Sequence, residues 1–404
     1  MVFLREIFLG CPDRDIPGAR KVLLYILPEK TNSANTEENA IKSSASLGNL
    51  TITARCEGDR KITMIFVPDP DSEYSDGEFA VYHVQTVVDD IIEVDQVYGT
   101  YTDENDYTPA KFEDLQDNFW VTFKYNETDK DTQLMPTVGL PLTGGQNGVL
   151  LPNAYALYLK AIEPYDFDIM IYDCTDMVVK KAIAQYIKDL NYLEGKGCQA
   201  VIPDFLKADN ELIYDVGNGY ILNDGTELKA EQAVWWVGGT SAGADYNKGL
   251  TNARHPNAIA VSGRLGSTDR KRALRQGRFV FYEDKGAVRV LEDINSLTTF
   301  TKKKLRRFRK NRFMRTLLNM GDSIYEVYNN FYLGDVDDGE DGKNLLKGEI
   351  LSLLSKYEST NGIQKFNEYD VEIFDGEEDD SVLIVISVRI MGSVDRIYVT
   401  IIAT

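Results

Sequence analysis

The sequence predicts an α/β core domain, a small all-β domain inserted into that core, and an α+β domain at the C-terminal end. Helix-type and strand-type patterns alternate from residue 143 to about residue 300, as in an α/β layer. Residues 31–142 instead contain short β-type runs between turn-forming residues. Two long amphipathic helices and two alternating apolar runs follow. The expected domains are 1–30 with 143–300, 31–142, and 301–404.

The N-terminal residues favour one helix and one strand. Residues 2–9 predict a short helix with Phe3, Leu4, Ile7 and Phe8 as its apolar positions. Residues 21–27, KVLLYIL, are nearly all apolar, which is typical of a strand buried on both faces. In the expected inserted domain, polar turn clusters separate four strand-type runs, at 50–55, 62–67, 79–86 and 119–125.

The expected core alternates helices with strands. The strands are expected at 167–172 and 199–202, and the helices at 155–162, 177–193 and 228–243. Helical spacing gives the second helix an apolar face of Val178, Ala182, Ile183 and Ile187. The third helix is expected to turn Ala233, Val234 and Val237 inward.

The C-terminal domain is expected to hold two long helices and two strands. One stripe steps by four and three through Phe313, Leu317, Met320, Ile324, Val327 and Phe331. The second stripe consists of Leu345, Leu346, Ile350, Leu353, Leu354 and Tyr357. Alternating apolar residues then predict strands at 382–390 and 396–402, on either side of a Gly392-Ser393 turn. The last strand could pair within its own domain or be donated to a neighbouring chain.

Composition excludes several classes of function. The net charge of −20 argues against general nucleic-acid binding. No apolar run approaches the roughly 20 residues that a membrane helix needs. The four cysteines are far apart without a CxxC pair, and the two histidines do not cluster with them. We therefore predict no metal site, no cofactor and no insertion into a membrane.

One motif suggests an enzyme. Gly239–Gly243, GTSAG, matches the G-x-S-x-G nucleophile elbow, so a serine hydrolase using Ser241 is an alternative hypothesis. The elbow requires a strand before the serine, whereas the residues before Ser241 favour a helix. The downstream histidine, His255, follows 14 residues later and leaves little room for an acid-bearing loop. We favour a glycine-rich helix end and predict no catalytic residue.

A basic run needs an explanation in so acidic a chain. Residues 302–315, KKKLRRFRKNRFMR, contain nine basic side chains in fourteen. They could form a solvated face screened by nearby acidic residues, or they could bind an acidic partner, which we favour. Nucleic acid is a weaker candidate, because no aromatic stacking platform accompanies the run.

Six segments, in this order, resemble the contractile tail sheath proteins of phages and phage-like particles of Gram-positive bacteria. They are 142–148 (LTGGQNG), 236–252 (WVGGTSAGADYNKGLTN), 277–281 (GRFVF), 290–299 (VLEDINSLTT), 308–315 (FRKNRFMR) and 394–400 (VDRIYVT). The resemblance covers essentially the whole chain and is strongest after residue 142.

The resemblance implies a structural subunit and not an enzyme. Such subunits form stacked hexameric rings around an inner tube and contract, without nucleotide hydrolysis, to drive the tube through a target cell envelope. The implied partners are other copies, the tube protein, the baseplate and the tail terminator, in a virion tail or tail-like particle assembled in the bacterial cytoplasm. Another tail component, from the baseplate or the tube, is the remaining alternative.

The resemblance also directs attention to two surfaces. We expect a strand between subunits at Ile397, Tyr398, Val399, Thr400 and Ile401, and a basic patch facing the tube at Arg306, Arg309, Lys310 and Arg312. Sheath proteins usually carry a further N-terminal segment with an arm that joins the mesh of strands. Residues 1–9 resemble a point already inside the core domain, so we do not expect that arm within this sequence.

Overall fold

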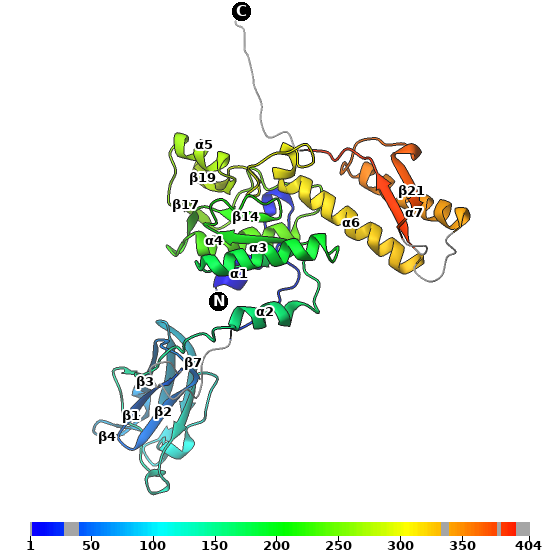
Figure 1. The fold of residues 1–404 in the computed structure, drawn as a ribbon. Coiled ribbons are helices and arrows are strands. Elements are labelled where there is room, and N and C mark those ends of the chain that lie inside the picture. Colours follow the sequence, from blue (N-terminus) through cyan, green and yellow to red (C-terminus); the bar gives the residue numbers. More distant parts are fainter. Residues whose placement is uncertain (1, 28–39, 333–338, 378–380, 393–404) are drawn as a thin grey trace, which may run out of the picture. The chain divides into compact units, whose positions relative to one another are not determined.

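The computed structural model describes residues 2–27, 40–332, 339–377 and 381–392. The chain divides into two compact units, residues 24–163 and residues 1–23 with 164–404 (Figure 1). The first is rich in β-strands and the second mixes helices with strands. Among the described residues, no helix is both long and apolar enough to cross a membrane.

The β-rich unit is built from two antiparallel sheets. One has the order β1-β2-β10, with β1 at Lys42–Leu47, β2 at Leu50–Glu57 and β10 at Val121–Lys124. The other has the order β11-β3-β6-β7, at Leu140–Pro141, Ile62–Pro68, Tyr82–Val88 and Ile91–Tyr98. Alternate side chains of β2, β3 and β6 form the core, because successive residues of a strand face opposite sides.

Smaller elements complete this unit. The hairpins are β4–β5 at Glu73–Ser75 and Glu78–Phe79, and β8–β9 at Thr100–Asp103 and Asp106–Thr108. Helix α2 spans Ala154–Ile162. All four strand runs expected from the sequence are confirmed, whereas β1 and β7 were not predicted, because β7 exposes Ile91 and Ile92 and does not show clean alternation.

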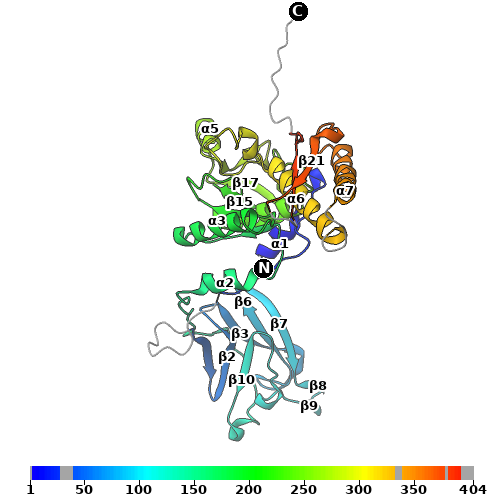
Figure 2. The ribbon, with the colours of Figure 1, turned by 45° about the vertical axis from the view of Figure 1, so that its right-hand side comes forward.

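The α/β unit is centred on a parallel sheet with the order β12-β13-β14-β18. These strands span Ile169–Ile171, Gln199–Pro203, Ile213–Val216 and Arg278–Phe279, and every residue of β13 and β14 is buried. Helix α4, Ala230–Gly243, packs against β12 and β13, and helix α1, Val2–Leu9, packs on α4 (Figures 1 and 2). Helix α3, Met177–Tyr192, also packs on β13. Parallel strands joined by helices are the arrangement that the sequence predicts.

Two further sheets and one short helix lie in the same unit. Strands β16-β15-β17 form an antiparallel sheet at Glu227–Leu228, Gly219–Leu222 and Ala258–Ser262. Strands β19 and β20 form a hairpin at Phe281–Asp284 and Ala287–Val290. Helix α5 spans Ser267–Arg275.

The C-terminal part of this unit has a hydrophobic cluster of its own. Helices α6, Asn311–Phe331, and α7, Glu340–Ser359, pack together and against the ribbon of β21, Val371–Asp375, and β22, Val382–Ile386. The buried side chains of the cluster include Met320, Leu346, Ile350, Leu354, Tyr357 and Val371. Both long helices predicted from the sequence are thereby confirmed, although Leu345 of the second stripe is exposed.

Two predictions about the core are wrong. Residues 21–27 form no strand, and their side chains are not buried: Leu24 is 66% and Ile26 84% exposed. An apolar run becomes a strand only where another edge offers backbone hydrogen bonds, and the described residues offer it none. Helix α3 exposes Val178 and Ala182, because its buried stripe is Val179, Ile183, Ile187 and Leu190.

The compact units do not coincide with the expected domain boundaries. Residues 143–163 belong to the β-rich unit, and residues 301–404 group with the α/β unit. The second grouping has a physical cause, since the start of α6 is buried against the core: Asn311 and Arg315 both bond to Asp293. The division into three domains remains a prediction.

Candidate functional site: interaction surfaces

The G-x-S-x-G motif lies in the last turn of α4 and serves helix packing. A Cβ atom at Gly239 would lie 2.6 Å from the Cα atom of Ile7, and one at Gly243 would lie 2.8 Å from the carbonyl carbon of Pro17. Only glycine lets α1 and the turn after it come so close to α4. A helix, not a strand, precedes Ser241, and Ser241 is buried. This geometry is not that of a nucleophile elbow.

His255 has partners other than Ser241. Its Nε2 atom lies 2.8 Å from Oε2 of Glu6, and its Nδ1 atom accepts a hydrogen bond from the Asn257 N–H at 3.2 Å. A nitrogen that accepts carries no proton, so the imidazole is neutral and donates through Nε2. The Tyr220 hydroxyl donates to the same carboxylate oxygen at 2.7 Å. All three side chains are fully buried and hold α1 against the core.

The electrostatics of this triad are set by burial and by these hydrogen bonds. Burial lowers the pKa of His255 below its usual value, against the opposing effect of Glu6. Burial alone would raise the pKa of Glu6, but His255 and Tyr220 outweigh it and the pKa is lowered overall. A charged Glu6 beside a neutral His255 is the arrangement that follows.

This arrangement predicts a loss of stability in acid. A histidine with a lowered folded pKa binds more protons when unfolded, so its contribution is complete above pH 6.5 and falls below it. A Glu with a lowered pKa contributes above pH 4.5 and loses this as the pH falls further. Urea denaturation should therefore show the advantage of the native protein over His255→Gln shrinking from pH 7.5 to pH 5, by at most about 1.4 kcal/mol per pH unit. A difference that stays constant over this range would contradict the assignment.

The native protein must be compared with the His255→Gln variant, because Asp215 changes the free energy of unfolding with pH in the opposite direction. Burial, opposed by Arg278, raises the pKa of Asp215 to about 6. Its protonation therefore stabilises the folded state as the pH falls from about 6 toward the usual Asp value. The His255→Gln variant retains Asp215, so this contribution cancels.

The basic run divides into an engaged part and an exposed part. Lys304 pairs with Glu211, Lys310 pairs with Glu292, and Arg315 pairs with Asp293 at 2.9 Å. These three are structural cations of the α/β unit. Lys302, Lys303, Arg306 and Arg307 are exposed. The paired residues therefore fit the interpretation of basic groups screened by nearby acidic residues. The exposed residues fit the interpretation of a surface that binds an acidic partner.

The four residues expected to face the tube are split in the same way. Arg306 is exposed in the short 3-10 helix Arg306–Arg309, whereas Arg309, Lys310 and Arg312 are half-buried. Arg312 donates to the carbonyl of Asn361 at 3.4 Å. Arg307 and Arg306 are therefore the residues best placed to meet a partner at this point.

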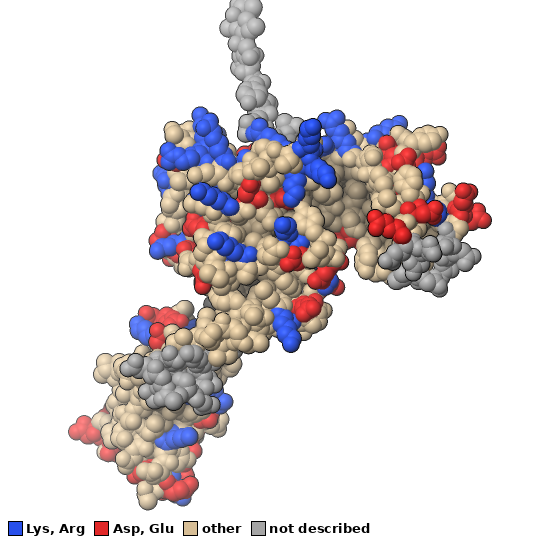
Figure 3. Space-filling model, in the orientation of Figure 1, with Lys and Arg blue, Asp and Glu red and all other residues tan. Residues whose placement is uncertain are grey.

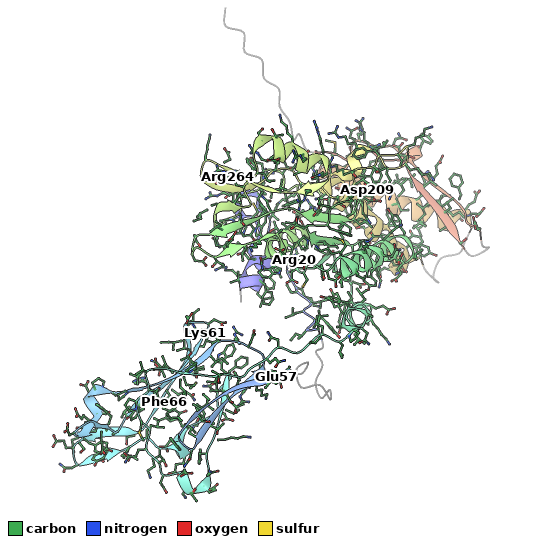
Figure 4. The ribbon with its side chains drawn as sticks, turned by 60° about the vertical axis from the view of Figure 1, so that its left-hand side comes forward. Arg20, Glu57, Lys61, Phe66, Asp209 and Arg264 are labelled. Atoms are coloured by element: carbon green, nitrogen blue, oxygen red, sulfur yellow. The ribbon has the colours of Figure 1, made fainter. Side chains whose placement is uncertain are left out.

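A second group of basic residues was missed by the sequence analysis. Helix α5, STDRKRALR, contains four basic residues in nine, of which Lys271, Arg272 and Arg275 are exposed. Arg264, just before it, is also exposed and lies at the rim of the unit (Figure 4). Local charge density along α5 is the signal that could have found it. Lys and Arg gather over α5 and over the segment before α6, on the same side of the unit (Figure 3). We call the exposed residues of these two segments the basic face.

Among the described residues, the C-terminal ribbon has open edges and an apolar outer side. Val382, Ile384 and Ile386 of β22 pack on the cluster around α7. Leu383, opposite Phe374 on β21, is 54% exposed, and Phe374 is 48% exposed. Within the described residues the sheet has only these two strands, so each strand has one unpaired edge. Such an edge is a template for strand addition. The predicted strand residues 397–401 lie outside the described residues.

The edges of the ribbon and the basic face are two exposed surfaces of the α/β unit that a partner can reach. Residues 151–296 match the phage tail sheath protein central domain, and residues 304–404 match the phage tail sheath C-terminal domain. The uncharacterized protein YqbK of Bacillus subtilis is 30% identical over 340 residues, which are 78% of this chain and 73% of YqbK. The phage-like element PBSX protein XkdK of the same organism is 29% identical over 74% of this chain and 70% of its own.

Two solved structures to which this chain is similar are also sheath proteins. The sheath tail protein of Desulfitobacterium hafniense is 31% identical with a TM-score of 0.68, over 89% of this chain and 81% of that one. The anti-feeding prophage helical sheath in its contracted state has a TM-score of 0.51 over 69% of this chain and 85% of that one, and at 12% identity this shows the fold alone. The chain belongs to the phage tail sheath protein family. It is a structural component of a phage tail or tail-like particle.

Proposed function

We propose that this chain polymerises as stacked hexameric rings around an inner tube, and that the resulting sheath contracts to drive the tube through a target cell envelope. The observation that carries the proposal is the match of one chain to both the central and the C-terminal sheath domains. Assembly in the host cytoplasm, and contacts with the baseplate and the tail terminator at the ends of the sheath, belong to the same proposal.

Strand donation is the proposed link between subunits. Residues 397–401 of one copy add to an open edge of the β21–β22 ribbon of a neighbour. The exposed edge and the apolar outer side of the ribbon support this, since backbone hydrogen bonds supply affinity and alternate side chains set the register. A strand on a tether stays paired while the subunits rotate, so the sheath holds together as it contracts.

The basic face is the proposed contact with the tube. Arg306 belongs to one part of it, the half-buried residues Arg309, Lys310 and Arg312 follow directly in sequence, and α5 contributes the other part. Each exposed ion pair contributes roughly 0–1 kcal/mol, but a sheath repeats the contact in every subunit. Screening by salt weakens such contacts.

We therefore expect Arg306→Glu with Arg307→Glu to reduce cosedimentation of sheath with purified tubes at least about tenfold at 0.1 M salt. Raising the salt concentration should weaken the native complex in the same way. The control is Lys124→Glu with Lys160→Glu, which reverses two exposed lysines of the β-rich unit. Equal binding by both variants and the native protein would contradict a tube contact at this face.

Two alternative functions are a serine hydrolase that uses Ser241 and another component of the tail. The geometry around Ser241 favours no hydrolase. A role as another tail component, from the baseplate or the tube, predicts particles other than wide sheath tubes, and imaging of the purified protein separates it from the sheath.

A further inference from the structure

A groove of about 470 Å³ lies in the α/β unit, and Lys304 at its edge directly follows Lys303 of the basic face. One wall is α3 and the other is the loop of residues 205–211, with Lys304 beside them. Its lining includes Lys181, Lys188 and Lys207, all exposed. Apolar side chains, Met177 and Leu206 among them, and polar ones, such as Gln185 and Asn210, line the rest. The groove therefore combines a cationic rim with apolar surface.

The acidic groups of the groove are already bound. Asp209 accepts hydrogen bonds from the backbone N–H groups of Thr298 at 2.6 Å and Thr299 at 2.8 Å. Burial raises its pKa, but hydrogen bonds from Thr299 and Thr298 outweigh this and hold the pKa at about 2. Asp209 lies near the segment that leads toward α6 (Figure 4). Glu211 is held by Lys304 and by the Tyr192 hydroxyl.

The rim lysines, in contrast, lack acidic partners. Lys181, Lys188 and Lys207 form no ion pair with any residue that the structure describes. The chain has a net charge of −20, yet three lysines around one groove form no ion pair with a described residue. An ion pair with a carboxylate would reduce the repulsion among these lysines. The groove can therefore bind negatively charged groups of a partner.

The loop that forms one wall is held in a fixed shape. Asp204, Lys207 and Asp209 have φ angles of 43°, 66° and 45°, in the left-handed region that costs a non-glycine residue of order 1 kcal/mol. Asp215 accepts from the Phe205 N–H at 2.7 Å and Asp209 is anchored as described, so the surrounding structure maintains the strained shape. A wall fixed in advance binds a partner without a further ordering cost.

Complementary charge lies at the far end of the same unit. Glu340, Asp341, Asp375 and Glu377 are exposed, and the pairing of Lys343 with Asp375 brings the start of α7 together with the end of β21. The same two stretches of sequence contain six further carboxylates, at Asp335, Asp337, Asp338, Glu378, Asp379 and Asp380. We call Glu340, Asp341, Asp375 and Glu377 the acidic end.

Within one chain, Lys304 at the groove lies too far from the acidic end to contact it. Lys304 precedes α6 and Glu340 follows it, and a helix of 21 residues is about 30 Å long. Two complementary surfaces that are separated on one molecule bind head to tail between copies. Such an interface is heterologous, and it generates closed rings or open helices.

We infer that the lysine groove of one copy binds the acidic end of a second copy of this chain. The inference rests on the proposed self-assembly and identifies one contact within it. Charged groups of both surfaces would then be partly desolvated against the apolar lining, which strengthens each pair relative to the open surface.

The test is charge reversal with rescue, read as the yield of sedimentable tubes from the purified full chain. The groove variant is Lys181→Glu with Lys188→Glu, and the acidic-end variant is Glu340→Lys with Asp341→Lys. Each alone should reduce the yield at least about tenfold at 0.1 M salt. The chain that carries all four substitutions has complementary charges again and should recover most of the yield. Lys124→Glu with Lys160→Glu is the matched control and should polymerise normally.

The outcomes are distinguishable. All six side chains are exposed, so unchanged thermal melting of the monomers separates assembly from folding. Native yield from the groove variant, or no recovery in the fourfold variant, would overturn the inference. A groove variant that polymerises normally but no longer binds tubes would assign the groove to the tube and overturn it as well. If the native chain itself forms no tubes, the proposed function fails first.

Discussion

Deleting residues 394–404 is expected to leave a soluble, folded monomer that does not polymerise. Within the described residues, β22 and the segment after it, as far as Ile390, already pack on the hydrophobic cluster around Leu346, Ile350 and Leu354. Ile390 also forms a β-bridge with Ile363. We therefore expect the cluster to persist after the deletion, whereas the proposed link between subunits depends on the deleted strand entirely.

The measurement combines thermal unfolding of the truncated monomer with sedimentation of polymer. Tube yield should fall by at least about a hundredfold, because strand donation repeats at every subunit. Restoring 394–404 with Ile397 and Val399 changed to Asp should not rescue assembly, since both are expected on one face of the strand. Ordered tubes from the truncated chain would exclude strand donation from this end. An unfolded truncated monomer would mean that the strand belongs to its own domain.

The second large effect is expected from Gly239→Ala. The new methyl group would overlap the backbone of Ile7, so α1 must move away from α4. Overpacking of this kind costs about 3 kcal/mol, and a displaced α1 also withdraws Glu6 from His255 and Tyr220. The midpoint of urea denaturation should fall accordingly.

A matched control lies in another helix. A Cβ atom at Gly321, in α6, meets nothing within 4 Å. Gly321→Ala should therefore stabilise the protein by up to about 1 kcal/mol, because alanine restricts the unfolded chain and favours helix. If Gly239→Ala is as harmless as Gly321→Ala, the motif at the end of α4 is not a packing motif.

Helices α6 and α7 were predictable because each carries its own amphipathic stripe, whereas α5 was not predicted. The stripes of α6 and α7 and the turned-in residues of α4 are local patterns, and local patterns are visible in sequence. Strands β2, β3 and β6 were predictable because they alternate cleanly. Residues 21–27 show the limit of this reasoning, since a strand requires a partner edge that sequence does not specify.

The interaction surfaces were less predictable, for a similar reason. Glu6 and His255 are 249 residues apart, and no sequence pattern announces their contact. The basic run was visible, but its division into engaged and exposed residues depends on Glu211, Glu292 and Asp293, which the fold brings to it. The lysine groove draws its cations from α3 and from the loop of residues 205–211, where each looks unremarkable alone.

Negative-stain electron microscopy of the purified protein tests the central claim most directly. A sheath subunit should polymerise, without nucleotide, into wide hollow tubes with a regular helical repeat. Charge reversal in the groove and deletion of residues 394–404 should make these tubes much rarer, by the factors given above, and the Lys124→Glu, Lys160→Glu control should form them. Native protein that remains monomeric at high concentration, or that forms only single rings or thin filaments, would contradict the account.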